Sequence, residues 1–272
     1  MTFERFDNRV NIRAKLVAIT PIFIGAQADS FKPGEVNGAC VKDSDGKPYI
    51  PGSSLKGVLR AFLSSVSADQ SCEKELSNSE KVACRKTTDD FLTKEQRDEE
   101  VRKAKEKEKY KGMKDDEILA DLILEASNKV ERLFGSQVMA GKVKIADAMP
   151  IEDHVVTEVR NGVAIDRDTH TALSGALFDT EVVAAGTAFQ FIASAENLTP
   201  DEADLFGQLM EYFAEGNITV GGRSRAGLGY VELKDVRVWI YHASESDFPA
   251  PEEIKDGLNG INGKAVCKCS KH

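Results

Sequence analysis

The chain has 272 residues, of which 41% are apolar and 30% charged, as in an ordinary soluble globular protein with one large domain or two small ones. No apolar run approaches the ~20 residues of a membrane span, and the charged start does not resemble a signal peptide, so we expect a cytoplasmic protein without a membrane partner. The net charge of −9 argues against general nucleic-acid binding, although a local basic groove is compatible with it.

The first predicted element is a half-buried strand over residues 10–18, where apolar and polar side chains alternate. Residues 24–48 lack a helical period and contain several glycines and prolines, so we predict a long loop there. A loop of this length inside a compact domain is often functional.

A helix is predicted from the apolar spacing between Leu55 and Val66. Ser53 or Ser54 would cap it, which places Lys56 in the first turn beside the free N–H groups. That combination makes an anion site, and the alternative is a capped helix with a solvated lysine.

Residues 69–131 change character, because a dense charge run is followed by apolar residues at helical spacing. We predict a helical insertion whose charged face is solvated. Beyond it, alternation predicts strands over residues 142–148 and 187–193, and the β-branched flanks of residues 157–183 predict an extended hairpin between them.

A second helix is predicted to start at Thr199, with Pro200 in the first position and Glu202 completing a capping box. It should end at Gly216, and a final strand is predicted over residues 230–240. The remaining residues, 244–272, form a polar C-terminal tail in this prediction.

Between the second helix and the final strand lies a glycine-rich loop, residues 221–229, with two arginines. Glycines allow positive φ and close backbone approach, and successive exposed N–H groups make a concave anion site. Arginine adds a fork of donors suited to phosphate. The loop is therefore a candidate for holding a phosphodiester chain, and the alternative is a simple turn with solvated arginines.

Without its insertions, the predicted order of elements is βαββαβ, the ferredoxin-like (RRM-like) arrangement of an α+β fold. We predict a core of residues 1–68 and 132–243, carrying the hairpin at about 157–183. The charged helical insertion would occupy residues 69–131.

Four stretches of the sequence stand out, in this order: YIPGSSLKG at residues 49–57, ERLFGS at 131–136, KIADA at 144–148 and GGRSRAGLG at 221–229. Together they resemble the RAMP superfamily of CRISPR-associated proteins, and more narrowly the repeating backbone subunit of type III interference complexes. The first and last stretches are specific to the superfamily, and the middle two point to the backbone subunit.

The resemblance implies an RNA-binding core whose copies stack along a guide RNA, with a hairpin thumb that kinks the guide–target duplex. The expected partners are guide RNA, target RNA and other type III subunits, including copies or paralogues of this chain. Phosphate contacts of this kind position RNA without reading its sequence. The residues expected to contact RNA are Ser54, Lys56, Gly221, Gly222, Arg223, Ser224, Arg225 and, in the hairpin, Arg167.

In the family, target RNA is cleaved with a divalent ion by an aspartate in the loop before the first stretch. The matching position here is Asn37, and an amide cannot supply the anionic ligand or base. Asp29 and Glu35 lie in the same loop and could substitute. We therefore predict a subunit that binds guide RNA and cuts weakly or not at all, so that a divalent metal is needed only if target RNA is cleaved.

The cysteines allow two interpretations. Cys72 and Cys84 in the insertion could complete a tetrahedral structural zinc site with Cys267 and Cys269 in the tail, if these segments meet. The alternative is that they are free thiols, because the spacings do not match a standard zinc finger. Cys40 is predicted to be a buried strand residue.

Two other functions remain open from the sequence. One is a RAMP endoribonuclease, acting on target RNA through Asp29 or on precursor guide RNA through His170 as general acid or base. The other is an adaptor that holds proteins through the charged insertion without touching RNA. A steep salt dependence of RNA binding would distinguish the RNA-binding functions from the adaptor.

Overall fold

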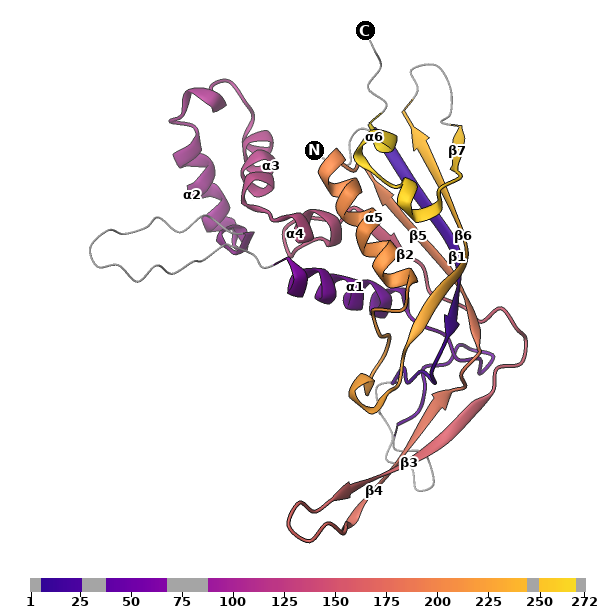
Figure 1. Ribbon diagram of the computed structural model, residues 1–272. Coiled ribbons are helices and arrows are strands. Elements are labelled where there is room, and N and C mark those ends of the chain that lie inside the picture. Colours follow the sequence, from indigo (N-terminus) through magenta and orange to yellow (C-terminus); the bar gives the residue numbers. More distant parts are fainter. Residues whose placement is uncertain (1–5, 26–37, 68–87, 244–249, 268–272) are drawn as a thin grey trace.

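The computed structural model describes residues 6–25, 38–67, 88–243 and 250–267. Within them the fold is of the α+β class, with antiparallel sheets and helices (Figure 1). The strands are β1 (Asn8–Ala18), β2 (Val143–Ile145), β3 (Thr157–Ile165), β4 (Ala172–Val183), β5 (Ala188–Glu196), β6 (Val231–His242) and β7 (Pro251–Ile254). The helices are α1 (Gly52–Val66), α2 (Lys94–Ala104), α3 (Asp115–Ala126), α4 (Lys129–Phe134), α5 (Pro200–Ala214) and α6 (Gly263–Val266), with short 3-10 turns η2 (Thr88–Phe91), η3 (Glu108–Tyr110), η4 (Ser224–Ala226) and η5 (Gly257–Gly260).

The main sheet has the strand order β2-β5-β1-β6-β7, and every neighbouring pair is antiparallel. This order is compatible with the ferredoxin-like arrangement, with β7 added at one edge. Strand β1 lies at the centre, and its side chains alternate between buried and outward-facing, as the sequence predicts for a half-buried strand. One face of the sheet is therefore apolar and the other polar.

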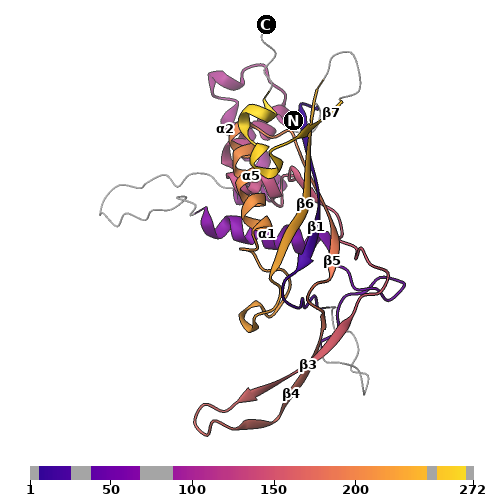
Figure 2. The same cartoon turned by 45° about the vertical axis from the view of Figure 1, so that its right-hand side comes forward.

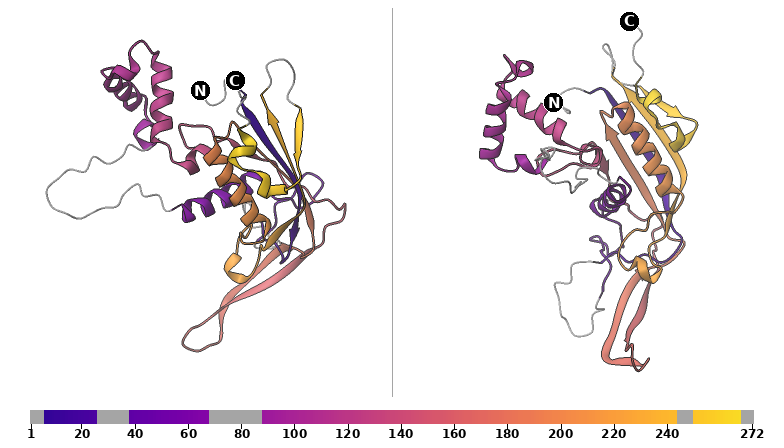
Figure 3. Two further views of the ribbon diagram at one scale, coloured as in Figure 1. Left: turned by 45° about the horizontal axis from the view of Figure 1, so that its top comes forward. Right: turned by 60° about the vertical axis from the view of Figure 1, so that its left-hand side comes forward.

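Helices α1 and α5 cover the apolar face (Figures 1 and 3). The stripe of Leu55, Leu59 and Leu63 makes α1 amphipathic and is buried. The rings of Phe62 in α1 and Tyr212 in α5 stack with centroids 4.9 Å apart, so the two helices also contact each other directly. The core between the helices and the sheet fixes the position of both ends of α1.

The predicted capping signal of α5 is confirmed. The helix starts at Pro200, and the carboxylate of Glu202 accepts a hydrogen bond from the Thr199 N–H at 2.9 Å. The same carboxylate pairs with Lys142 Nζ at 2.6 Å, and both side chains are buried. Lys142 also donates to the Asn197 carbonyl at 2.7 Å, so this buried pair ties the start of α5 to the segment that leads into β2.

The helices between η2 and α3 surround a small apolar core of their own, separate from that of the sheet. Phe91 and Ile118 lie at its centre, fully buried. Most charged side chains of α2 face outward, and Thr93 caps that helix through a capping box with Gln96. The buried members of this small core are Phe91, Val101, Ala104, Tyr110, Ile118 and Leu122.

The predicted hairpin forms between Thr157 and Val183 as the two-stranded sheet β3-β4, which extends away from the body (Figure 1). Ile22 and Val183 exchange backbone hydrogen bonds of 3.0 and 2.8 Å at its base. Glu181 accepts from Lys42 Nζ at 2.6 Å and from the Cys40 N–H at 3.1 Å. Burial raises the pKa of Glu181, but the hydrogen bonds from Lys42 and Cys40 outweigh it, so the pKa lies below its usual range. The hairpin is thereby fixed to the body at one end.

The expectation of a polar tail after residue 243 is wrong for residues 250–267. Strand β7 pairs with β6, and η5 and α6 pack against α5 and the sheet. Leu258, Ile261 and Val266 are buried in the main core. These three apolar residues are spaced too far apart and among too many polar ones to give a periodic signal. No helix among the described residues is long and apolar enough to cross a bilayer.

Candidate nucleic-acid interface

The start of α1 differs from the predicted cap. The N-cap is Pro51 rather than a serine, and the helix begins at Gly52 without a side-chain cap. Instead, the Gly52 N–H donates to Asp147 Oδ1 at 2.7 Å. A Cβ on residue 52 would lie 2.3 Å from the carbonyl oxygen of Ile145, so only glycine allows this close approach.

As a result Lys56 is the fifth residue of α1 and not in its first turn. Its side chain is half-buried, and helical side chains point back toward the N-terminus, so Lys56 lies over the first turn. Burial lowers the pKa of Lys56, and the nearby charge of Arg60 lowers it further. In the described part of the chain no carboxylate pairs with Lys56, so an incoming anion would relieve the unfavourable charge.

Residues 221–229 form a loop that is packed against residues 21–23. The Gly222 N–H donates to the Phe23 carbonyl at 2.8 Å, and the Gly229 N–H donates to the Pro21 carbonyl at 2.9 Å. Gly221 has φ +86°, and a Cβ there would lie 2.2 Å from the Phe23 oxygen. Glycine is therefore needed at position 221 for docking the loop onto the body.

This docking changes the predicted role of the loop N–H groups. Those of Gly222 and Gly229 bind the body, and those of Ala226 and Gly227 close the 3-10 turn η4. Three successive N–H groups, of Arg223, Ser224 and Arg225, have no backbone partner among the described residues. Arg223 is in the left-handed region and the next residues are helical, which is the geometry of an anion-binding nest.

Arg223 is held between two aromatic rings. Its guanidinium carbon lies 4.5 Å from the centroid of the Phe178 ring in β4 and 5.3 Å from that of Phe23. Stacking leaves the edge of a guanidinium free to donate to phosphate, and it orders the side chain in advance. The arginine thus links the glycine loop to the base of the hairpin.

The glycine loop and the start of α1 adjoin the same irregular layer of the molecule. The Gly222 N–H of the loop donates to the Phe23 carbonyl. The Val41 N–H donates to the Ile24 carbonyl, and the N–H of Tyr49, which leads into α1, donates to the Val41 carbonyl. All views show the loop beside α1, between this helix and the hairpin, on the helix-covered side of the sheet (Figures 1, 2 and 3). The predicted segments therefore share one side of the protein.

A family model described as the RAMP superfamily matches residues 15–232. The chain belongs to the RAMP superfamily. The match contains all four stretches on which the sequence resemblance rests, and membership supports a CRISPR-related role in RNA binding. A comparison with curated proteins found no match.

In the second and third of the four RAMP stretches, the polar side chains bind other parts of the fold. Asp147, in the third stretch, accepts from the N–H of Gly52 in the first, so the two stretches meet at the start of α1. In the second, Arg132 donates to the Leu124 carbonyl at 2.8 Å and to Ser127 Oγ at 3.0 Å, which joins α4 to the end of α3. These residues position the interface and are not free to contact a ligand.

The other predicted contact residues of this RAMP protein are distributed unevenly. Ser224 and Arg225 are exposed in the loop, and Ser54 is half-buried in the first turn of α1. Arg167 is exposed at the turn of the β3-β4 hairpin, away from the loop (Figure 1). Arg167 therefore belongs to a separate point of contact.

Several predicted residues lie outside the described part of the chain. Asp29 and Asn37 are among them, so weak or absent cleavage of target RNA stays a prediction. Cys72, Cys84 and Cys269 are also outside it, while Cys267 is an exposed free thiol. The described residues contain no cluster of metal ligands, and the zinc site stays untested by them. Cys40 is buried, as predicted.

Sequence reasoning missed three residues of the interface: Arg60, Phe23 and Phe178. Arg60 follows Lys56 at the i,i+4 spacing of one helix face, which the sequence does contain. The pairing of Phe23 with Phe178 around Arg223 had no such signal, because the three residues are far apart in sequence.

Proposed function

We propose that this chain is a guide-RNA-binding backbone subunit of a type III CRISPR effector ribonucleoprotein used in RNA-guided antiviral defence. The observation that carries the proposal is Arg223, which lies against the rings of Phe23 and Phe178 in a member of the RAMP superfamily. Beside it are three N–H groups that have no backbone partner among the described residues. Lys56, unpaired and half-buried on the neighbouring helix, supplies the second phosphate contact.

The chemistry of these groups fits the backbone of RNA. Guanidinium, ammonium and backbone N–H groups all donate to phosphate oxygens and carry no information about the base. Arg225 and Ser224 extend the same set of donors from the exposed side of η4. Such a site binds any guide sequence, as a subunit of a guide-programmed complex must.

The core is proposed to be the ferredoxin-like βαββαβ unit, made of β1, α1, β2, β5, α5 and β6. This assignment is supported by the strand order β2-β5-β1-β6 and by the two helices on one face. The unit places the α1 start and the loop before β6 at one end of the helix-covered face, where guide RNA would pass.

The β3-β4 hairpin is proposed to act as the thumb on the guide–target duplex. It projects from the body next to the glycine loop and exposes apolar side chains along its length (Figure 1). Apolar side chains inserted between bases unstack and kink a duplex. The exposed residues are Val159, Val163, Ile165 and Phe178. Target RNA and neighbouring subunits, including copies of this chain, are the expected partners of this element.

The test is the salt dependence of RNA binding by the purified chain. Lys56, Arg223 and Arg225 are changed together to Gln, and binding of a labelled single-stranded RNA is followed by fluorescence anisotropy. Each lost phosphate contact lowers the slope of log K against log salt by ~0.7, so the triple variant should lose about 2 units of slope. The affinity should fall equally for unrelated sequences.

A matched control removes three exposed cations from α2 and its C-terminal flank, by changing Lys94, Arg102 and Lys107 to Gln. This control should retain the wild-type slope, and Arg223→Lys, which keeps the charge but not the planar stacking group, should lie between. An unchanged slope in the triple variant, with its fold intact by circular dichroism, would exclude the proposed contacts. Equal losses in the control would favour the adaptor or a nonspecific charge effect.

A further inference from the structure

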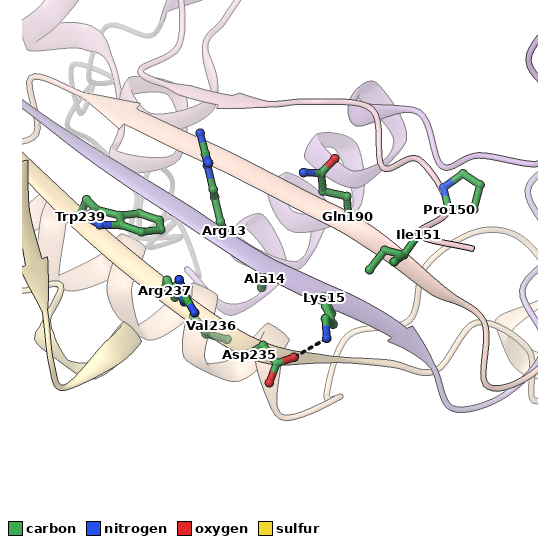
Figure 4. A pocket seen from close by; sticks show the side chains of 10 residues that line it. All are labelled: Arg13, Ala14, Lys15, Pro150, Ile151, Gln190, Asp235, Val236, Arg237 and Trp239. Carbon is green, nitrogen blue, oxygen red and sulfur yellow. Dashed lines mark ion pairs between the residues drawn. The ribbon is translucent and has the colours of Figure 1, made fainter. Parts of the chain in front are cut away.

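The face of the main sheet that carries no helix has an open hollow across β5, β1 and β6 (Figure 4). Its volume is about 980 Å³, and charged or amide side chains provide much of its lining. Arg13 and Lys15 of its lining project from the outward face of β1, away from the buried face that α1 and α5 cover (Figure 4). Neither Lys56 nor any residue of the glycine loop lines it. The lining includes Arg13, Lys15, Gln190, Asp235, Arg237 and Trp239.

Two arginines on neighbouring strands line this hollow (Figure 4). Arg13 of β1 is directly opposite Arg237 of β6 in the strand register. Like charges directly opposite each other destabilise a sheet. The neighbouring cation Lys15 is neutralised by Asp235 at 2.7 Å, and among the described residues no carboxylate forms an ion pair with either arginine. Asp235 is also near Arg237, but its pKa is lowered mainly by Lys15.

The third group is Trp239, the one tryptophan in the 272-residue sequence. It is half-buried on β6, and the guanidinium carbon of Arg13 lies 5.8 Å from the centroid of its ring. An indole beside two unpaired arginines offers both a stacking surface and donors for phosphate. Gln190 adds an amide that can donate to and accept from a base edge.

The arrangement favours a nucleic-acid strand over other occupants. Arg13 and Arg237 lie directly opposite each other on neighbouring strands, so both guanidinium groups can donate to the phosphates of one extended chain. Sheets of related architecture bind single-stranded RNA by stacking bases on outward aromatic residues. An acidic peptide would satisfy the arginines but would gain nothing specific from the indole and the amide.

We propose that the open face of the sheet is a second binding site for single-stranded RNA, with Arg13 and Arg237 on phosphate and Trp239 stacked on a base. This site shares its class of ligand with the proposed function but none of its residues. Either site can therefore be absent without affecting the argument for the other.

Trp239 itself reports on the site. Titrating the full chain with an unlabelled single-stranded RNA of about ten nucleotides should quench its fluorescence, because a base stacks on the indole. The quenching should persist in the Lys56, Arg223 and Arg225 triple variant and vanish in the Arg13→Gln/Arg237→Gln double variant. In the triple variant, the double substitution should lower the salt slope of the remaining binding by about 1.4.

The contribution of stacking is measured separately by anisotropy in the triple-variant background. Trp239→Ala should weaken binding about tenfold, and Trp239→Phe should retain most of the affinity. A matched control, Lys15→Gln/Asp235→Asn, removes a self-neutralised pair from the same hollow and should leave the affinity unchanged. The arginine double variant should melt no lower than wild type, because it removes a like-charge pair.

Three results would overturn the proposal. The first is quenching that survives Arg13→Gln/Arg237→Gln. The second is quenching that disappears with the triple variant alone, since the indole would then report binding at the glycine loop. The third is polyglutamate that quenches and competes as well as RNA at equal charge, which would identify an acidic protein segment as the occupant.

Discussion

At the scale of single residues, the candidate interface contains groups whose charge or backbone conformation is unfavourable in the chain alone. Lys56 is half-buried with no carboxylate partner in the described part of the chain, and Arg60 adds a like charge. Arg223 adopts a left-handed backbone conformation, which is uncommon for a residue with a side chain. Functional sites often retain groups that lower the stability of the chain alone, because the bound ligand offsets the unfavourable charge or conformation.

We expect Lys56→Met to raise the free energy of unfolding at pH 7 while weakening RNA binding. The pKa of Lys56 is lower in the folded chain than its ordinary value of 10.5, so the charged form favours unfolding. The resulting loss of stability is fully present below the pKa that Lys56 has in the folded chain, and it disappears as the pH rises to 10.5. The stability difference between variant and wild type, measured by urea unfolding, should therefore shrink over that range.

The same lysine allows a direct check by NMR of ¹³C-methylated lysines. Arg60→Gln should raise the pKa of Lys56 but leave it below the ordinary value, because burial is the larger cause. Bound RNA should also raise it. A Lys56 that titrates as a free lysine in the absence of RNA would contradict the account of its burial.

Two glycines of α1 make a matched pair. Gly52→Ala should lower stability by about 1–3 kcal/mol, because its Cβ would meet the backbone carbonyl of Ile145 at 2.3 Å. Gly57→Ala has nothing within 4 Å and should stabilise the helix by about 0.5–1 kcal/mol. Thermal unfolding of both variants checks the prediction, and equal effects would refute the close approach at Gly52.

At the scale of elements, the interface is assembled from segments that are each fixed by other parts of the fold. The loop is docked on residues 21–23, α1 is tied to Asp147, and the hairpin is tied to Ile22 and Lys42. The buried pair of Lys142 and Glu202 sets the start of α5, which packs against α1.

Breaking that buried pair should be costly. Lys142→Met alone should lower stability by about 3–5 kcal/mol, because it leaves the Glu202 carboxylate buried and unpaired. Adding Glu202→Gln should recover most of the loss, since the glutamine oxygen can still accept from the Thr199 N–H. Urea unfolding of the single and double variants measures the difference. A double variant as unstable as the single would show that the charge is not the cause.

At the scale of the whole molecule, a chain with a net charge of −9 carries unpaired cations on both sides of one sheet. The helix-covered side has Lys56, Arg223 and Arg225, and the open side has Arg13 and Arg237. The excess negative charge elsewhere should limit nonspecific binding of RNA, so we expect RNA to bind at the two proposed sites rather than over the whole surface.

The C-terminal elements should be essential to the stability of the whole core. Ending the chain after Ala243 removes Leu258, Ile261 and Val266, each of which contributes ~1.5–3 kcal/mol when fully buried. A loss on the order of 5 kcal/mol is comparable with the total stability of a domain. Thermal unfolding and solubility test this, with removal of residues 268–272 as the control. A shortened chain that melts like the full one would show that β7, η5 and α6 are dispensable.

The sequence by itself determined the class of the fold, most of its regular elements and the family, and it pointed to the stretches of the candidate interface. Alternation along β1, helical spacing in α1 and the capping box of α5 are local patterns. They depend on neighbouring residues only, so the sequence alone is enough to predict them. The sequence did not predict the packing of residues 250–267, because a short strand and two single helical turns are too short to show a periodic pattern of apolar residues.

Only the tertiary structure decided what the individual site residues do. The cap of α1 comes from Asp147, 95 positions away, the loop glycines serve docking, and Arg223 is held by two distant rings. The opposition of Arg13 and Arg237 likewise depends on strand register. Each of these contacts joins segments that are remote in the chain, and the free energy that brings them together comes from burying a shared core rather than from any local pattern.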